Sequence, residues 1–215
     1  IGAERFAALL DEICTWLNQQ GTCMALCIGS AGISNREMES LVLAGMQRGG
    51  IANWKMVGDQ VIALTGALDG QPGIALIAGT GSICFGKNAA GQFARSGGWG
   101  HFIGDEGSGY ALGRDVLSQA VREADGRSEG TEILNAVYVR LGVSDPGGIV
   151  SFVYGKDTDK AAIAAFSSVA LTLSAQGNHR AVEILSRGAG ELCDMALAVQ
   201  KKLHLEGCPI ALLGG

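Results

Sequence analysis

The sequence predicts an α/β fold with two lobes, the second of which is rich in helices. Segments with strand and helix patterns alternate as far as Gly98, whereas from Ser108 onward almost every segment has helical periodicity. The composition, 47% hydrophobic and 17% charged residues, is that of a globular protein. We expect residues 1–72 to be part of an N-terminal α/β lobe and residues 73–215 to form a C-terminal lobe with a helical insertion.

The first lobe begins with a helix predicted over residues 3–20, because apolar side chains recur there at helical spacing: Phe6, Leu9, Leu10, Ile13 and Leu17. The stretch MALCIGSAG, residues 24–32, predicts a short buried strand that runs into a turn of small residues. A helix over 35–48 with Asn35 as its N-cap, a strand over 54–57 and a helix over 60–68 follow.

The second lobe is predicted to begin with three strands in a meander. IALIAGTGSICFGKN, residues 74–88, alternates strand, glycine turn and strand, and GQFARSGG, residues 91–98, supplies the third strand. The remaining segments are predicted as helices over 108–124, 130–141, 146–154, 159–176 and 179–203, and a final strand over 209–213.

Charge and cysteine usage exclude several classes of protein. The net charge is −5 and no cluster of basic residues interrupts the sequence, so nucleic acid and anionic membranes are poor candidates for partners. No apolar run approaches the roughly 20 residues of a membrane span and no signal-peptide pattern is present, which favours the cytoplasm. The six cysteines form no CxxC pair and the three histidines are scattered, so we expect most thiols to pack as small buried hydrophobic groups.

The GTGS turn, residues 79–82, is a candidate anion site. Gly79, Thr80, Gly81 and Ser82 present four successive backbone N–H groups with little side-chain cover, and two hydroxyls add further donors. The alternative is a plain β-hairpin turn that needs glycine for its positive φ angles.

The stretch GGWGHFIGDEGSGYALG suggests a sugar site. Trp99 between Gly98 and Gly100 places a flat apolar ring next to accessible backbone, and Asp105 lies at the expected start of a long helix. The alternatives are a core aromatic for Trp99 and an N-cap for Asp105. Asp59, which follows a strand and a glycine at the start of a helix, is either another cap or a general base for an attacking hydroxyl.

The stretches VGDQVIAL, ALIAGTGS, GGWGHFIGDEGSGYALG and the terminal ALLGG occur in this order over nearly the whole chain. Together they resemble the N-acetylglucosamine kinase and BadF/BadG/BcrA/BcrD ATPase family, within the sugar kinase, Hsp70 and actin superfamily. The block from GGWG to GDEGS is the most specific part. The resemblance implies a ribonuclease-H-like (actin-like ATPase) fold whose two lobes close on ATP and a sugar.

The resemblance also implies an activity. It is that of an ATP-dependent kinase that phosphorylates the 6-hydroxyl of N-acetylglucosamine or glucosamine, with Mg²⁺ carried by ATP and no separate metal site. The resemblance further implies a cytoplasmic homodimer that associates through the helical half. Neither nucleic acid nor a membrane is an implied partner.

Individual residues carry over from the family pattern. Asp59 is similar to the general base and also contacts the sugar. The implied phosphate and adenosine positions are Gly79, Thr80, Gly81, Ser82, Ala164, Gly214 and Gly215, and the implied sugar positions are Ser30, Gly98, Trp99, Gly100 and Asp105.

The sequence departs from the family pattern at both ends. It contains no glycine-rich hairpin of the DGGGT type, no sugar-binding Asn upstream of IGAERF, and no closing strand and helix after the final glycines. We therefore expect this chain to be part of a longer kinase. Two alternatives are an ATPase activator of a radical dehydratase, which would need cysteines such as Cys84 and Cys193 at an iron–sulfur cluster, and a nucleotide or sugar sensor without turnover.

Overall fold

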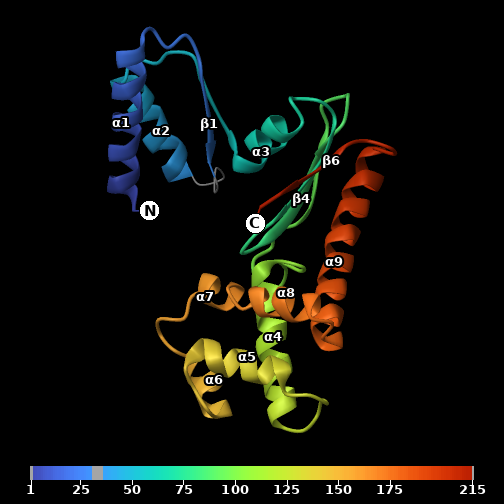
Figure 1. The fold of residues 1–215 in the computed structure, drawn as a ribbon. Coiled ribbons are helices and arrows are strands. Elements are labelled where there is room, and N and C mark those ends of the chain that lie inside the picture. Colours follow the sequence, from blue (N-terminus) through green and yellow to red (C-terminus); the bar gives the residue numbers. More distant parts are fainter. Residues whose placement is uncertain (1, 31–35, 215) are drawn as a thin grey trace. The chain divides into compact units, whose positions relative to one another are not determined.

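The structure, a computed structural model, describes residues 2–30 and 36–214. These residues fall into two compact units, Ile1–Gly70 and Gln71–Gly215. Figure 1 shows the order of the elements along the chain. Each unit has a hydrophobic core of its own, so each is described separately.

The first unit is a small α/β layer. Its elements are α1 (Ala3–Gln20), β1 (Leu26–Ser30), α2 (Arg36–Arg48), β2 (Trp54–Gly58) and α3 (Asp59–Ala67), and β1 pairs in parallel with β2. Helices α1 and α2 pack together, as Figure 1 shows, and bury Leu10, Cys14, Val42, Met46 and Ile51. The predicted bounds of the elements are confirmed to within two residues, but β1 alternates half-buried and exposed residues and is not the buried strand expected. The turn predicted after this strand and the N-cap Asn35 lie outside the described residues.

The second unit is built on a four-stranded sheet with the order β5-β4-β3-β6. The strands are β3 (Gly73–Ala78), β4 (Ser82–Lys87), β5 (Phe93–Gly97) and β6 (Ile210–Leu213). The first three form the predicted antiparallel meander, and β6 joins the edge in parallel with β3. Helix α9 (His179–Leu203) packs across the sheet, and the two bury Ile74, Leu76, Cys84, Met195, Ala196, Val199, Leu203 and Leu205.

The rest of the second unit is a helical subdomain that lies beyond one end of the sheet (Figure 1). It comprises α4 (Gly109–Ala124), α5 (Glu132–Leu141), α6 (Pro146–Val153), α7 (Lys160–Ala164) and α8 (Ser167–Ala175). Its core is formed by Val116, Leu117, Ala120, Ile133, Leu134, Val137, Ile149, Phe166, Val169, Ala170 and Ile184. Because Ile184 belongs to α9, the long helix is part of both cores of this unit.

The single helix predicted over residues 159–176 is wrong, because the chain breaks between α7 and α8. The amide of Phe166 donates to the carbonyl of Ile163 (3.0 Å), and that of Val169 to the carbonyl of Phe166 (3.0 Å), which is the tighter i→i−3 spacing. Phe166 is thereby buried, with its ring centroid 5.3 Å from that of Phe152. Burial of this large apolar side chain outweighs the continuation of a regular helix.

The expectation that most thiols are buried is also wrong. Only Cys14 and Cys84 are buried, whereas Cys27 and Cys193 are exposed and the other two are half-buried; all six are free. Helix α9 carries Cys193 on its outward face because its sheet-facing positions are taken by residues such as Met195 and Val199. Among the described residues, no helix is both long enough and apolar enough to cross a lipid bilayer.

Candidate functional site

The turn from Gly79 to Ser82 joins β3 to β4 and offers fewer free amides than the sequence predicts. The amide of Gly79 donates to the carbonyl of Gly81 (2.9 Å), which closes the turn, and the amide of Ser82 donates to the carboxylate of Asp105 (3.3 Å). Within the part of the chain that the structure describes, the amides of Thr80 and Gly81 make no hydrogen bond. The predicted four-amide nest is thus corrected to two available N–H groups, because the turn uses the other two to hold its own shape.

Hydrogen bonds fix this turn against the start of helix α4. The amide of Gly109 donates to the carbonyl of Gly79 (2.8 Å), and the hydroxyl of Ser82 donates to the carbonyl of Glu106 (2.6 Å). The buried hydroxyl of Ser108 accepts from the amide of Ala111 (3.2 Å) and caps the helix. The turn therefore lies at the positive end of a 16-residue helix, where anions are favoured.

A pocket of about 400 Å³ opens at this turn. It is lined by Ala78, Gly79, Thr80, Gly107, Gly109, Leu112, Ala161, Ala164, Ala165 and Ser167. The pocket brings together two sequence-predicted positions, the GTGS turn and Ala164, although 84 positions separate Thr80 from Ala164 (164 minus 80). Most lining side chains are small, so a ligand here can approach the backbone closely.

Asp105 lies beneath the turn as half of an ion pair. Its carboxylate is 2.6 Å from the ammonium of Lys160, and the two side chains are 6% and 30% exposed. Asp105 has a positive φ of 60° and does not cap α4, since Ser108 does. A Cβ on Gly81 would lie 2.9 Å from the Lys160 ammonium nitrogen and 3.1 Å from both Asp105 oxygens, so a side chain at position 81 would push against the ion pair.

Lys160 is a site residue that the sequence reasoning missed. It is the first residue of the short helix α7, directly after the N-cap Asp159, whose side chain accepts from the amide of Ala162 (2.8 Å). A lysine at a capped helix start carries no signal of its own. Its importance comes only from the fold, which packs α7 against α4 and so brings the ammonium group to Asp105.

The GGWG segment begins at Gly97, the buried last residue of β5, and continues into a loop in which Trp99 and Gly100 are exposed. Gly98 and Gly100 have φ angles of +73° and +85°, which side-chain-bearing residues rarely adopt. Trp99 is 62% exposed, so the core-aromatic alternative is wrong, and the guanidinium carbon of Arg95 lies 4.1 Å from the centre of its ring. Phe102 is also exposed on the same loop. An open aromatic face with a cation on one side suits contact with a partly apolar ring.

Of the last two glycines, Gly214 and Gly215, only Gly214 is among the described residues. Gly214 follows β6, and a side chain there would overlap the carbonyl of Ala78, one residue before the GTGS turn. Its φ of +108° also favours glycine. Gly215 lies outside the described residues. The second unit thus brings Gly214 next to the strand end that carries Gly79.

In the first unit, two further predicted residues share one edge of the parallel sheet. Ser30 ends β1 and pairs in register with Gly58, so it lies beside the start of α3, where Asp59 is the first residue. The Asp59 side chain is exposed and accepts from the amide of Gln60 (2.9 Å), while Gly58 is the N-cap. The carboxyl edge of parallel strands is where α/β folds commonly bind ligands.

The described residues contain no group of three or more His, Cys, Asp or Glu side chains placed to hold a metal ion. Mg²⁺ is commonly held by one or two carboxylates together with substrate phosphates.

A model of the BadF/BadG/BcrA/BcrD ATPase family matches residues 9–215. The chain belongs to this family. One protein of similar sequence is an N-acetylmuramic acid/N-acetylglucosamine kinase of Clostridium acetobutylicum. It is 35% identical over 191 residues, which cover 88% of this chain and 62% of that protein. An N-acetyl-D-glucosamine kinase of Dictyostelium discoideum is 30% identical over 205 residues, 92% of this chain and 64% of that protein. The chain thus spans less than two thirds of the length of these relatives.

Solved structures agree with membership of the BadF/BadG/BcrA/BcrD ATPase family. The structure of a candidate N-acetylglucosamine kinase from Chromobacterium violaceum has a TM-score of 0.73 and 28% identity, and the match covers 89% of this chain and 64% of that one. A second, from Porphyromonas gingivalis, shares the fold with a TM-score of 0.66 at 21% identity, over 99% of this chain and 81% of that one. These likenesses confirm the predicted α/β fold of the actin-like ATPase type with a helix-rich second half.

Proposed function

We propose that the full-length protein is a kinase that transfers the γ-phosphoryl group of ATP to the 6-hydroxyl of an amino sugar, N-acetylglucosamine or glucosamine. The observation that carries this proposal is the pocket at the start of α4, which is lined by both the GTGS turn and Ala164 of α7. The family of the chain is established. Two relatives that cover most of this chain are kinases named for N-acetylglucosamine. The lobes over 1–72 and 73–215 are part of the same proposal.

The phosphate end of ATP is assigned to the GTGS turn. The amides of Thr80 and Gly81 are available to phosphate oxygens, and Gly79 and Ser82 keep the turn in shape through their own hydrogen bonds. Mg²⁺ carried by ATP would neutralise charge on the phosphates. Ala164, Gly214 and Gly215 are assigned to the adenosine side, which is supported for Ala164 by its place in the pocket wall and for Gly214 by its place beside Ala78.

The sugar is assigned to the loop that follows β5 and to the edge of the first sheet. Trp99 offers an exposed ring, and Gly98 and Gly100 leave the backbone around it uncovered. Asp105 has more than one lone pair per carboxylate oxygen, so it can accept from a sugar hydroxyl while it holds Lys160. Ser30 is the remaining assigned contact.

Asp59 is assigned the role of general base. The attacking hydroxyl must lose its proton as it meets the phosphorus atom, and a carboxylate within hydrogen-bond reach can accept that proton. The exposed side chain at the carboxyl edge of the first sheet supports this role. We extend the proposal to a cytoplasmic homodimer, whose mass in solution can be measured by light scattering.

The experiment that tests this function is coupled ADP release by the full-length protein with Mg·ATP. Parallel reactions contain no acceptor, N-acetylglucosamine, glucosamine or glucose, and mass spectrometry of the product locates the phosphate. Strong stimulation by an amino sugar, with the phosphate on the 6-oxygen, is the expected result. Hydrolysis that is independent of the acceptor would point instead to an activator ATPase, and no turnover at all would point to a sensor.

A further inference from the structure

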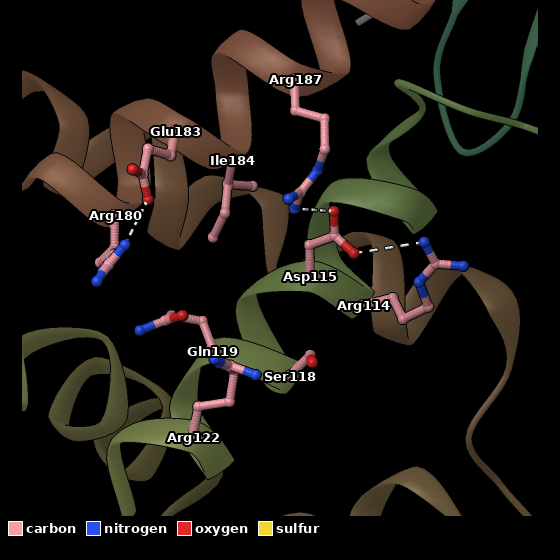
Figure 2. A pocket seen from close by; sticks show the side chains of 9 residues that line it. All are labelled: Arg114, Asp115, Ser118, Gln119, Arg122, Arg180, Glu183, Ile184 and Arg187. Atoms are coloured by element: carbon pink, nitrogen blue, oxygen red, sulfur yellow. Dashed lines mark hydrogen bonds and ion pairs between the residues drawn. The ribbon is translucent and has the colours of Figure 1, made fainter. Parts of the chain in front are cut away.

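A second, strongly charged pocket of about 500 Å³ lies between helices α4 and α9 (Figure 2). It is lined by Arg114, Asp115, Ser118, Gln119, Arg122, Arg180, Glu183, Ile184 and Arg187. Four of the ten arginines of the chain therefore surround one cavity. The expectation that basic residues do not cluster holds along the sequence but is wrong in three dimensions.

The helical repeat explains how distant arginines converge. On α4, Arg114, Ser118 and Arg122 recur every four residues and so lie on one face of the helix. On α9, Arg180 and Arg187 are seven residues apart, which is two turns. The two faces meet because α4 packs on α9, and buried Ile184 is the apolar lining residue of the cavity.

The carboxylates of the pocket do not balance its arginines. Arg187 and Arg114 both pair with Asp115, at 2.7 Å and 3.3 Å, as Figure 2 shows. Arg180 pairs with Glu183 at 2.9 Å. Among the residues that the structure describes, the guanidinium of Arg122 has no ion-pair or hydrogen-bond partner. Four guanidinium groups thus face two carboxylates, which leaves a surplus of two positive charges in a chain whose net charge is −5.

The surplus charge is open to solvent. The side chains of Arg114 and Arg187 are 59% and 61% exposed, and that of Arg180 is 44% exposed. Like charges that line one cavity repel one another, and an anion that binds between them would relieve that repulsion. Exposed ion pairs of this kind contribute little to folding stability, so stability alone does not account for the arrangement.

We propose that this pocket binds a small molecule through a phosphoryl group that carries two negative charges. The planar guanidinium fork matches phosphate oxygens two at a time, and a charge of −2 matches the surplus. The cavity volume lies in the range typical of small-molecule sites. Either inorganic phosphate or a phosphate monoester supplies this chemistry. No residue of this pocket lines the pocket at the GTGS turn, so the site does not depend on the proposed kinase activity.

Isothermal titration calorimetry on the full-length protein tests the proposal, with inorganic phosphate, glucose 6-phosphate and glucose as probes. The Arg122→Gln and Arg187→Gln variants remove one guanidinium each. The matched control is Arg48→Gln, which removes an exposed arginine that pairs with Asp11 in the first unit. We expect both phosphates to bind the parent protein, glucose to add nothing at this site, and each pocket variant to weaken phosphate binding roughly tenfold while the control does not.

The relative affinities distinguish the two sources of the phosphoryl group. Tighter binding of glucose 6-phosphate than of inorganic phosphate assigns the site to monoesters, and equal or weaker binding assigns it to free phosphate. The proposal is overturned if neither phosphate binds, or if both bind equally well to the Arg122→Gln and Arg187→Gln variants. It is also overturned if these variants change the oligomeric state in analytical ultracentrifugation, since the pocket would then be a protein contact. Circular dichroism melting confirms that each variant is folded.

Discussion

Lys160 and Asp105 form an ion pair at 2.6 Å that joins two segments 55 residues apart. One partner begins α7 and the other lies under the GTGS turn, where its carboxylate also accepts from the amide of Ser82. The pair therefore connects the helix that carries Ala164 to the turn that faces it across the pocket. Removal of either charge is expected to affect both walls of that pocket.

Lys160→Met is expected to lower the free energy of unfolding by about 2 kcal/mol. The substitution leaves the Asp105 carboxylate without its partner in a position where only 6% of its side chain is exposed. Breaking a fully buried pair costs about 3–5 kcal/mol, and the partial exposure of Lys160 reduces that cost. Urea denaturation followed by circular dichroism measures the change.

An Asp105→Asn background separates the ion pair from other effects of the lysine. Asparagine tolerates the positive φ at this position and still accepts from the amide of Ser82, but it carries no charge. We expect Lys160→Met to cost less than about 1 kcal/mol in that background. An equal loss in both backgrounds would show that the packing of the lysine stem, and not its charge, is responsible.

Gly113→Ala is expected to destabilise the second unit and to disturb the pocket at the GTGS turn. A Cβ on Gly113 would overlap the carbonyl of Ile163 in α7, and backbone cannot move aside as a side chain can. Gly190→Ala, on the open side of α9, is the matched control, since a Cβ there meets nothing within 4 Å. We expect the control to be neutral or to stabilise by up to about 1 kcal/mol. Equal melting temperatures for the two variants would contradict the close packing of α4 on α7.

Asp59→Asn is expected to reduce kcat by roughly 10²–10⁴-fold, the usual contribution of a positioned general base. Asparagine has nearly the same shape and leaves binding groups in place, so KM for the sugar should change little. The matched control is Asp69→Asn, which alters an exposed aspartate just after the same helix α3. Unchanged turnover in the Asp59 variant would remove this residue from the proposed mechanism.

Trp99→Ala is expected to raise KM for the sugar about tenfold, because stacking of an aromatic ring contributes about 1–2 kcal/mol to such contacts. The melting temperature should stay the same, since the side chain is 62% exposed. Phe102→Ala removes a more exposed aromatic from the same loop and is the control. If both variants bind the sugar as the parent does, the loop is not the sugar site.

Cys84 is expected to resist alkylation at pH 8, whereas Cys27 and Cys193 react. Burial raises the pKa of the Cys84 thiol to about 12, so the thiolate is nearly absent below pH 10 and grows only as the pH approaches the pKa. The other two side chains are exposed. Peptide mapping after treatment with iodoacetamide measures each site. Rapid labelling of Cys84 would favour the alternative function, an activator ATPase, because that function needs accessible thiolates at an iron–sulfur cluster.

The parts of the fold that the sequence predicts are those governed by local pattern. The meander follows from strand alternation around glycine turns, and α9 follows from apolar residues repeated over 25 positions. The break between α7 and α8 does not follow, because it depends on the burial of Phe166 against Phe152, which lies on another helix. Tertiary packing outweighed the helical pattern at that point.

The same distinction holds for the candidate site. The GTGS turn and the GGWG loop carry their own glycine signatures, so the sequence locates both. The sequence does not predict which amides of the turn are free, because the amide of Ser82 donates to Asp105, which lies 23 residues further along the chain. Lys160 and the arginine pocket depend on helix–helix contacts, which a single sequence does not reveal.

The length of α9 has a consequence for how the second unit unfolds. Its 25 residues extend about 37 Å, with Ile184 in the core of the helical subdomain and Val199 in the core of the sheet. Unfolding of this shared helix would remove side chains from both cores at once, so we expect the sheet and the subdomain to lose structure in one cooperative transition. In native-state hydrogen exchange, slowly exchanging amides of β4 and α4 would then report the same opening free energy, and a substitution in either core would lower both together.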